Sequence, residues 1–173
     1  MGDTTLWIAL VTGATAISAS WVTGAHTARS ARYQANLAVQ ARRDDETRSA
    51  RRRAYSVLVE HTHALGGLYG ESRVAVQQQD VRARRAALQD LLVRQRETYH
   101  QHFLPALRAV SLEGPDEVAT ASEALRQAST QVYRLLGDIS VGSRSTDDLH
   151  TTIVAFWDAV RGFILSGRRA LNS

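Results

Sequence analysis

The pattern of hydrophobic and polar positions is helical along most of the chain. From residue 54 onward, apolar residues recur every three or four positions, and no stretch alternates as a strand does. Four such stripes are separated by turn residues, and each is as wide as the apolar face of a core-facing helix. The pattern predicts an all-α fold in which residues 54–173 form an antiparallel four-helix bundle.

The four stripes define the expected core. Those of the first two helices are Ala54, Leu58, His61, Leu65, Leu68, Ser72 and Ala75, then Val81, Leu88, Leu92, Tyr99, Phe103 and Val110. Those of the last two are Val118, Ala121, Leu125, Ala128, Val132, Leu135 and Ile139, then Leu149, Ile153, Phe156, Trp157, Val160 and Ile164.

Proline, glycine and hydroxyl residues set the expected helix ends. Pro105 should kink the second helix or split off its last turn, because it lacks a backbone donor and its ring clashes one turn back. Gly114-Pro115 should separate the second helix from the third. Ser145 or Thr146 is the expected N-cap of the fourth.

The first part of the chain has a different pattern. Residues 4–28 contain no Asp, Glu, Lys or Arg, and the next 25 residues contain eight arginines. A helix of 25 residues is about 37 Å long, against a hydrocarbon core of about 30 Å. Trp7 and Trp21 lie near its ends, as interfacial aromatic residues do. We therefore predict a transmembrane anchor over residues 1–28, the alternative being a buried helix of a soluble protein.

Charge predicts the orientation of this anchor. No Lys or Arg precedes the uncharged run, whereas arginines follow it closely, and basic flanks stay on the cytoplasmic side. We expect a single-pass protein of the inner membrane, with its N-terminus outside and its C-terminal domain in the cytoplasm. The absence of cysteine agrees with a reducing compartment.

The arginines after the anchor predict a basic helical stalk over residues 29–53. This segment carries a net charge of about +5, whereas residues 54–173 carry 13 arginines and 13 acidic residues. Basic residues near a membrane are attracted to anionic lipid headgroups. The expected headgroup contacts are Arg29, Arg32, Arg42 and Arg43. A solvated spacer is the alternative. A nucleic-acid partner is not expected, because the neutral domain has no basic face and no aromatics are interleaved with the arginines.

Small residues follow one face of the predicted anchor. Thr12, Ala16, Ser20 and Gly24 stand at successive i+4 positions. Close backbone approach across small residues is a main route to helix association in lipid. The spacing predicts that the anchor forms a homodimer through this face. The alternative is that small residues are simply common in this segment.

One pattern has the spacing of a di-metal site. Di-iron helical bundles use two Glu-x-x-His pairs and one acidic residue from each of the other two helices. The pairs here are Glu60 with His63 and Glu97 with His100, and the acidic residues are Glu123 and Asp158. These side chains fall off the core stripes, so we expect them to face solvent and to hold no metal. His61 lies on a stripe and is expected to be a hydrogen-bonded core histidine.

No catalytic arrangement is recognisable elsewhere. The chain has no Cys, no Gly-x-Ser-x-Gly elbow and no phosphate-binding glycine loop, so we expect no enzyme activity and no cofactor. Gly66, Gly67 and Gly70 interrupt a predicted helix and are interpreted as a close-packing patch.

The layout resembles small single-pass membrane proteins of Streptomyces and related actinobacteria. The resemblance is carried by the Trp-containing anchor, by Arg52-Arg53-Ala54-Tyr55 and by Gly114-Pro115-Asp116-Glu117-Val118. It implies an N-terminal anchor and a helical cytoplasmic domain, but no activity and no functional residues.

Two functions remain open. The first is a non-enzymatic scaffold, adaptor or regulatory partner at the membrane, recruiting an unknown protein. The second is a membrane-tethered sensor that binds a small apolar ligand in the bundle core. A cavity near Gly66, Gly70 and Trp157 would favour the sensor, and a filled core with an exposed apolar strip would favour the adaptor.

Overall fold

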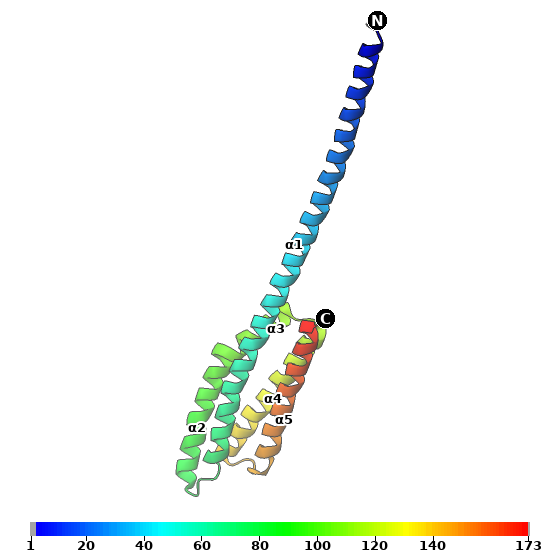
Figure 1. Cartoon of the computed structure of the whole chain (residues 1–173). Coiled ribbons are helices and arrows are strands. Elements are labelled where there is room, and N and C mark those ends of the chain that lie inside the picture. The colour runs from blue at the N-terminus through cyan, green and yellow to red at the C-terminus, as the bar shows by residue number, and fades with distance from the viewer. Residues whose placement is uncertain (1–2, 173) are drawn as a thin grey trace. The chain divides into compact units, whose positions relative to one another are not determined.

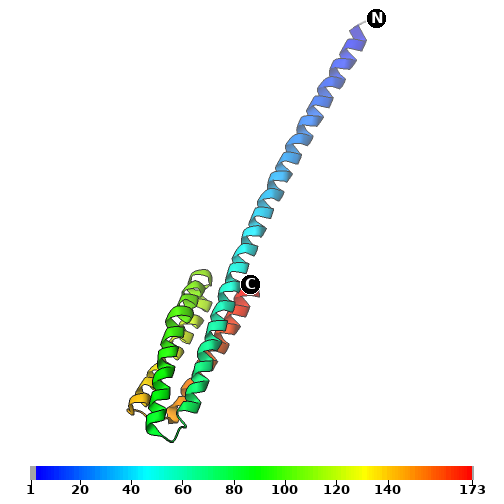
Figure 2. The same ribbon diagram turned by 90° about the vertical axis from the view of Figure 1, so that its left-hand side faces the viewer.

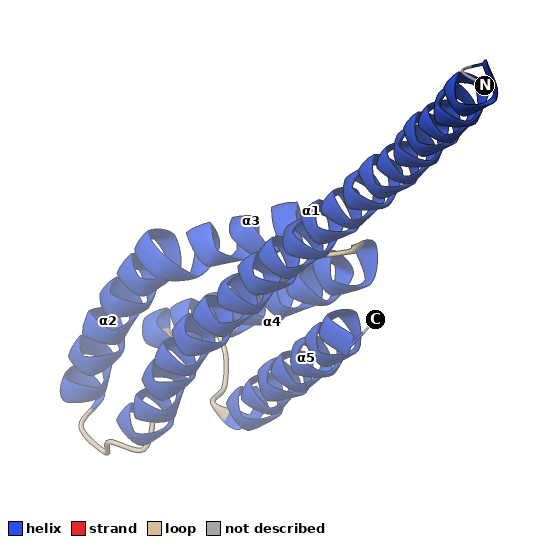
Figure 3. Cartoon of the chain, turned by 45° about the horizontal axis from the view of Figure 1, so that its top comes forward, coloured by secondary structure: helices blue, strands red, loops and turns tan. Residues whose placement is uncertain are grey.

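The computed structural model describes the backbone of residues 3–172 and the side chains of residues 33–172. Its elements are α1 (Asp3–Ala75), α2 (Val81–Thr98), the π-helical turn η1 (Tyr99–Phe103), α3 (Leu104–Glu113), α4 (Asp116–Val141) and α5 (Asp147–Asn172) (Figure 1). The described part of the chain contains helices, turns and loops but no strand (Figure 3). The predicted all-α fold is confirmed.

The chain divides into two compact units, Met1–Glu46 and Thr47–Ser173. In the first unit, all side chains from residue 33 to residue 46 are exposed. Among the residues with described side chains, we find no helix that is both apolar and long enough to cross a bilayer. The predicted anchor, residues 4–28, lies outside that set, so its membrane insertion stays a prediction.

The second unit is a helical bundle. Residues 47–75 of α1 lie beside α2 and α5, while α4 packs against α2, α3 and α5 (Figures 1 and 2). The α1–α2 and α4–α5 loops lie at one end of the bundle, and the α3–α4 turn lies at the other (Figure 1). Successive long helical segments therefore run antiparallel.

The stripes predicted for α4 and α5 are largely confirmed. All seven predicted α4 positions except Ala121 are buried, and α5 buries four of its six predicted positions. Trp157 and Ile164 are partly buried, and Phe163, which was not predicted, is fully buried. A regular spacing of strongly apolar residues was sufficient to predict these two faces.

The stripe predicted for α1 and α2 is wrong at several positions. His61 is only partly buried, and Val81 is 55% exposed. The core instead includes residues with polar atoms, namely Tyr55, Thr62, Tyr69 and Gln95. The Thr62 hydroxyl can be buried because it donates to the Leu58 carbonyl oxygen at 2.7 Å.

The disruption expected at Pro105 takes the form of the π-helical turn η1. The Leu104 backbone N–H donates to the Tyr99 carbonyl, five residues back. Pro105 follows at the start of α3, where its missing N–H and its ring would disturb the preceding α-helical turn. The wider turn accommodates the proline and changes the helical phase between α2 and α3.

Local side chains explain the helix ends. Asp80 begins α2, since its carboxylate accepts a hydrogen bond from the Arg82 backbone N–H. Gly142 ends α4 with a φ of 78°, a left-handed conformation that glycine adopts without strain. The Ser145 hydroxyl accepts from the Asp147 backbone N–H at the start of α5, in agreement with the predicted cap region.

The part of α1 around Arg51 and Tyr55 contacts the segment around Glu113 and Gly114 within the bundle. The Arg51 side chain donates from Nε to the Glu113 carbonyl oxygen at 2.7 Å. A Cβ atom at Gly114 would lie 3.1 Å from the Tyr55 hydroxyl and 2.8 Å from the Val110 carbonyl oxygen. These segments therefore fasten the α3–α4 turn to α1.

The predicted close-packing patch is confirmed at Gly66 but not at its neighbours. A Cβ atom at Gly66 would lie 2.4 Å and 2.6 Å from Cζ2 and Cη2 of the Trp157 ring. A Cβ atom at Gly67 or Gly70 would meet nothing within 4 Å. The indole of α5 therefore covers Gly66 and takes the space in which a cavity was considered.

We expect Gly66→Ala to lower the free energy of unfolding of residues 47–173 by about 1–3 kcal/mol, because the methyl group overlaps Trp157. Gly70→Ala is the matched control on the same helix. It should leave stability unchanged or raise it by up to about 1 kcal/mol, since alanine favours the helix. Urea unfolding followed by circular dichroism measures both, and equal effects would contradict the packing described here.

Candidate functional site

A cavity of about 300 Å³ lies between α1, α2, η1 and α4. The surface that faces the cavity is mainly apolar, although six of its ten lining residues carry polar or charged side chains. The lining residues are Leu65, Tyr69, Gln95, Arg96, Tyr99, His100, Arg126, Ser129, Thr130 and Tyr133. Because small-molecule sites typically combine an apolar wall with a few placed polar groups, this cavity is the candidate site.

Tyr69 forms the inner wall of the cavity. Its ring meets Phe156 edge-on, with centroids 4.9 Å apart, and its hydroxyl lies 2.8 Å from the Ser129 Oγ. Burial raises the pKa of the Tyr69 phenol, and the hydrogen bond to Ser129 opposes this shift only in part. Tyr69 is thus a neutral, fixed surface at neutral pH.

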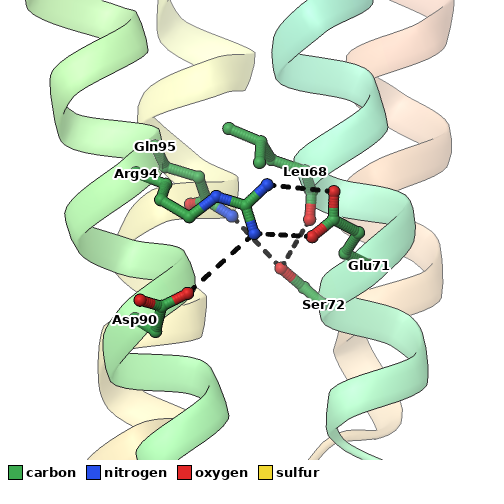
Figure 4. Close-up of polar contacts among 6 residues, drawn as sticks. All are labelled: Leu68, Glu71, Ser72, Asp90, Arg94 and Gln95. Atoms are coloured by element: carbon green, nitrogen blue, oxygen red, sulfur yellow. Dashed lines mark hydrogen bonds and ion pairs between the residues drawn. The ribbon is translucent and has the colours of Figure 1, made fainter.

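Gln95 is the buried polar group of the cavity. Its side chain is 1% exposed, and its Nε2 donates to the Ser72 Oγ at 3.1 Å (Figure 4). The Ser72 hydroxyl in turn donates to the Leu68 carbonyl oxygen at 2.9 Å. Ser72 can therefore only accept from Gln95, and this requirement fixes the orientation of the amide.

The orientation of this amide leaves Gln95 Oε1 without a donor among the described residues. Figure 4 shows that this oxygen lies on the side of the amide away from Ser72. A buried acceptor without a hydrogen bond costs about 1–3 kcal/mol, so it is an uncommon feature of a folded core. Because this oxygen has less than 1 Å² of accessible surface, it belongs to the packed core behind the cavity and not to the open surface of the cavity.

Cationic side chains stand at the rim of the cavity. Arg126 makes a two-pronged ion pair with Glu123, with donor–acceptor distances of 2.7 Å and 2.6 Å. These bonds raise the pKa of the Arg126 guanidinium and lower that of Glu123. Arg96 is exposed, and it has no carboxylate within 4.0 Å among the described residues. Arg96 is therefore the cation available to a ligand.

A second polar cluster lies at the surface between α1 and α2. Arg94 bonds Glu71 at 2.8 Å and 3.3 Å, and it lies 3.9 Å from an Asp90 oxygen (Figure 4). These side chains are about half exposed, so the pair contributes at most about 1 kcal/mol. It joins the two helices beside Gln95 without entering the cavity.

The structure brings together histidines that are distant in the sequence. His61 of α1 stacks on His102 of η1, with centroids 5.2 Å apart, and His63 lies 5.4 Å from the Trp157 ring. The prediction of a hydrogen-bonded core histidine at residue 61 is wrong, because the neighbouring Thr62 takes the buried position. The hydrophobic pattern of a single helix could not predict the pairing of His61 with His102, because these two histidines belong to different helical elements.

The facing predicted for the two Glu-x-x-His pairs is confirmed. All six side chains of that pattern are exposed, namely Glu60, His63, Glu97, His100, Glu123 and Asp158. Within the described part of the chain, no three His, Asp or Glu side chains lie close enough together to hold a metal ion.

None of the residues predicted to bind lipid or to self-associate is among the lining residues of this cavity. Arg42 and Arg43 are exposed, and Arg42 pairs with Glu46 at 3.0 Å on its own helix. The side chains of the other predicted residues lie outside the described set, and they are Thr12, Ala16, Ser20, Gly24, Arg29 and Arg32. Lipid contact and self-association therefore stay predictions.

The chain matches no protein-family model, no curated protein and no solved structure. The actinobacterial resemblance stays a prediction, and the functional argument depends on the geometry of the cavity.

We expect Tyr69→Phe to lower the free energy of unfolding by about 1–2 kcal/mol at neutral pH, because it removes the hydrogen bond to Ser129. The raised pKa of Tyr69 adds a pH dependence. Above pH 10 or so, the unfolded chain loses this proton first, so the folded state loses stability as pH rises.

The Phe variant should therefore show a shallower alkaline decline between about pH 10 and 12, measured by urea unfolding of residues 47–173. Tyr133→Phe, at an exposed tyrosine of the same cavity, is the control. Identical alkaline slopes for the two variants would contradict the buried, neutral state of Tyr69.

Proposed function

We propose that this protein is a membrane-anchored, non-enzymatic helical bundle that binds a small molecule at the cytoplasmic face of the inner membrane. It would act there as a regulatory partner of another protein. The observation that carries the proposal is the cavity of about 300 Å³ between α1, α2, η1 and α4, which combines an apolar wall with a few polar and cationic groups. Small-molecule sites are typically built in this way.

The chemistry of the lining residues favours binding over catalysis. The serine and threonine hydroxyls that α4 contributes to the cavity are both engaged, since Ser129 bonds Tyr69 and Thr130 donates to the Arg126 carbonyl oxygen at 2.9 Å. Neither hydroxyl has a hydrogen bond to an imidazole or a carboxylate among the described residues, so neither is activated as a nucleophile.

The location of the protein rests on its sequence. An uncharged run over residues 4–28 followed by an arginine-rich segment favours a single-pass anchor, with the bundle in the cytoplasm. The proposal includes contact of anionic headgroups with the first arginines, Arg29, Arg32, Arg42 and Arg43. It also includes self-association of the anchor through Thr12, Ala16, Ser20 and Gly24.

The alternative function is that of a scaffold or adaptor without a ligand. A filled core together with a continuous apolar strip on the bundle surface would favour it. The exposed large apolar side chains are instead distributed over several helices, including Val74 of α1, Leu112 of α3, Val141 of α4 and Leu165 of α5. The cavity therefore gives the sensor the stronger support.

A reporter active only in the cytoplasm should work when it is fused after Ser173, because the basic flank holds the domain on that side. A reporter that requires export should be inactive at the same position. Moving Arg29 and Arg32 to positions before Thr4 should reduce the difference in activity between the two reporters. The opposite pattern in the unchanged protein would overturn both the orientation and the lipid contact.

Ligand binding is tested by extraction of the protein purified from its native membranes. A small molecule should be recovered from the unchanged protein and lost from Thr130→Phe, whose ring would fill the cavity. Thr120→Phe, at an exposed position of the same helix, should retain it. Mass spectrometry compares the three samples. If no compound is found in the unchanged protein that is absent from Thr130→Phe, the proposed binding of a small molecule is contradicted.

A further inference from the structure

We propose that the candidate cavity binds a planar aromatic molecule of about two fused rings, held between a row of side chains on α2 and η1 and a row on α4. Each row carries one tyrosine and one arginine. This inference rests on the proposed small-molecule binding and adds the chemical class of the ligand. The arrangement of the two rows over a closed, apolar floor carries it.

The floor of the cavity is closed and offers few hydrogen bonds. Leu65 and Tyr69 of α1 are each only 1% exposed, so they close the bottom of the cavity. The Tyr69 and Ser129 hydroxyls already bond each other, and the Thr130 hydroxyl donates to a backbone carbonyl of its own helix. A polar group pressed against this floor would lose its hydrogen bonds to water without an equivalent replacement. The body of the ligand is therefore apolar.

The accessible side chains form two rows along the cavity. Arg126, Thr130 and Tyr133 stand at positions i, i+4 and i+7 of α4, so they lie on one face of that helix. Arg96 and Tyr99 are three residues apart at the junction of α2 and η1. All five side chains are at least partly exposed, and all line the cavity. A ligand in the cavity therefore contacts both rows.

The two rows run in opposite directions, because α2 and α4 are antiparallel (Figure 1). The tyrosine of each row therefore lies toward the arginine of the other row. The pKa of the Arg126 guanidinium is raised by Glu123 and also by the Tyr99 hydroxyl, which agrees with this diagonal arrangement. The two bonds to Glu123, at 2.7 Å and 2.6 Å, hold the cation in place beside the cavity.

An aromatic ring is the apolar group that suits such a lining. Tyrosine rings gain from offset or edge-on contact with a second ring, beyond the gain from burying apolar area. The negative face of a ring also attracts a guanidinium group, whereas an aliphatic group would only separate that cation from water. An aliphatic ligand would thus gain from the floor alone, and an aromatic ligand would gain from the floor and from both rows.

The volume of the cavity sets the size of the ligand. A cavity of about 150 Å³ holds one benzene ring. The cavity here has a volume of about 300 Å³, which is twice as large, and it therefore accommodates two fused rings.

The first experiment compares two probes that share a fused ten-carbon skeleton and one hydroxyl group. They are 2-naphthol, which is aromatic, and decahydro-2-naphthol, which is saturated. The full chain in nanodiscs of zwitterionic lipid is titrated with each probe by calorimetry. Nanodiscs that carry Thr130→Phe, whose ring would fill the cavity, give the blank for uptake into lipid.

We expect 2-naphthol to bind the unchanged protein about threefold to tenfold more tightly than decahydro-2-naphthol, because only the aromatic probe gains from the two rows. We expect 9-phenanthrol, which has a third ring, to bind no more tightly than 2-naphthol. Its extra ring finds no room in a cavity of about 300 Å³.

The second experiment varies the two rows. Tyr133→Leu keeps an apolar side chain but removes a ring, so it should reduce the preference for 2-naphthol by about twofold or more, whereas Tyr133→Phe should keep the preference. Arg126→Met should reduce the preference in the same way. Arg134→Met, at an exposed position of α4 outside the cavity, is its matched control. Circular dichroism checks that every variant is folded.

Each result decides a separate part of the proposal. Equal or tighter binding of decahydro-2-naphthol to the unchanged protein would overturn the aromatic class, and tighter binding of 9-phenanthrol would overturn the size. An unchanged preference in Tyr133→Leu and Arg126→Met would overturn the role of the two rows.

Failure of this inference is distinguishable from failure of the proposed function. If no probe binds while a compound is still extracted from the unchanged protein but not from Thr130→Phe, the ligand class is wrong and the proposed function stands. If no probe binds and no such compound is found, both are wrong.

Discussion

The contact of Trp157 with Gly66 sets how closely α5 approaches α1, and the aromatic core depends on this approach. The indole occupies the place where any side chain at residue 66 would begin. Phe156 precedes it on α5, 5.3 Å from the indole centroid, and reaches Tyr69 at 4.9 Å. Tyr69 in turn bonds Ser129 of α4. One close contact between two helices therefore begins a chain of contacts that extends to a third.

The same chain of contacts explains why the cavity lies on the α2 side of Tyr69. Beside Tyr69 and Gly66, Phe156 and Trp157 fill the space between α1 and α5. The space between α1, α2 and α4 is instead lined by the amide of Gln95 and by hydroxyl groups of α4. The π-helical turn adds to this difference, because it brings Tyr99 and His100 to the cavity. Such turns often occur at functional sites, since the wider turn repositions side chains that a regular helix would place elsewhere.

The sequence was sufficient to predict the fold class and two of the four core faces. Stripes of strongly apolar residues with regular spacing, as in α4 and α5, depend on a single helix and can be read from it. The faces of α1 and α2 were less predictable, because Tyr55, Thr62 and Tyr69 are buried through hydrogen bonds or ring contacts made with other residues.

The candidate site could not be predicted for a related reason. Gln95 occupies a core position, four residues after Leu91 and seven after Leu88, and this spacing was the available signal. Glutamine is usually exposed, so the pattern does not distinguish a buried amide from a surface one. The cavity itself depends on how four helical elements meet, which the pattern of a single helix does not show. A buried polar atom without a partner does not mark the site, because the Tyr55 hydroxyl beside Gly114 is a second such atom in the filled part of the core. What separates the candidate site from the rest of the bundle core is therefore the open space itself, with an apolar wall and cationic side chains lining the same cavity.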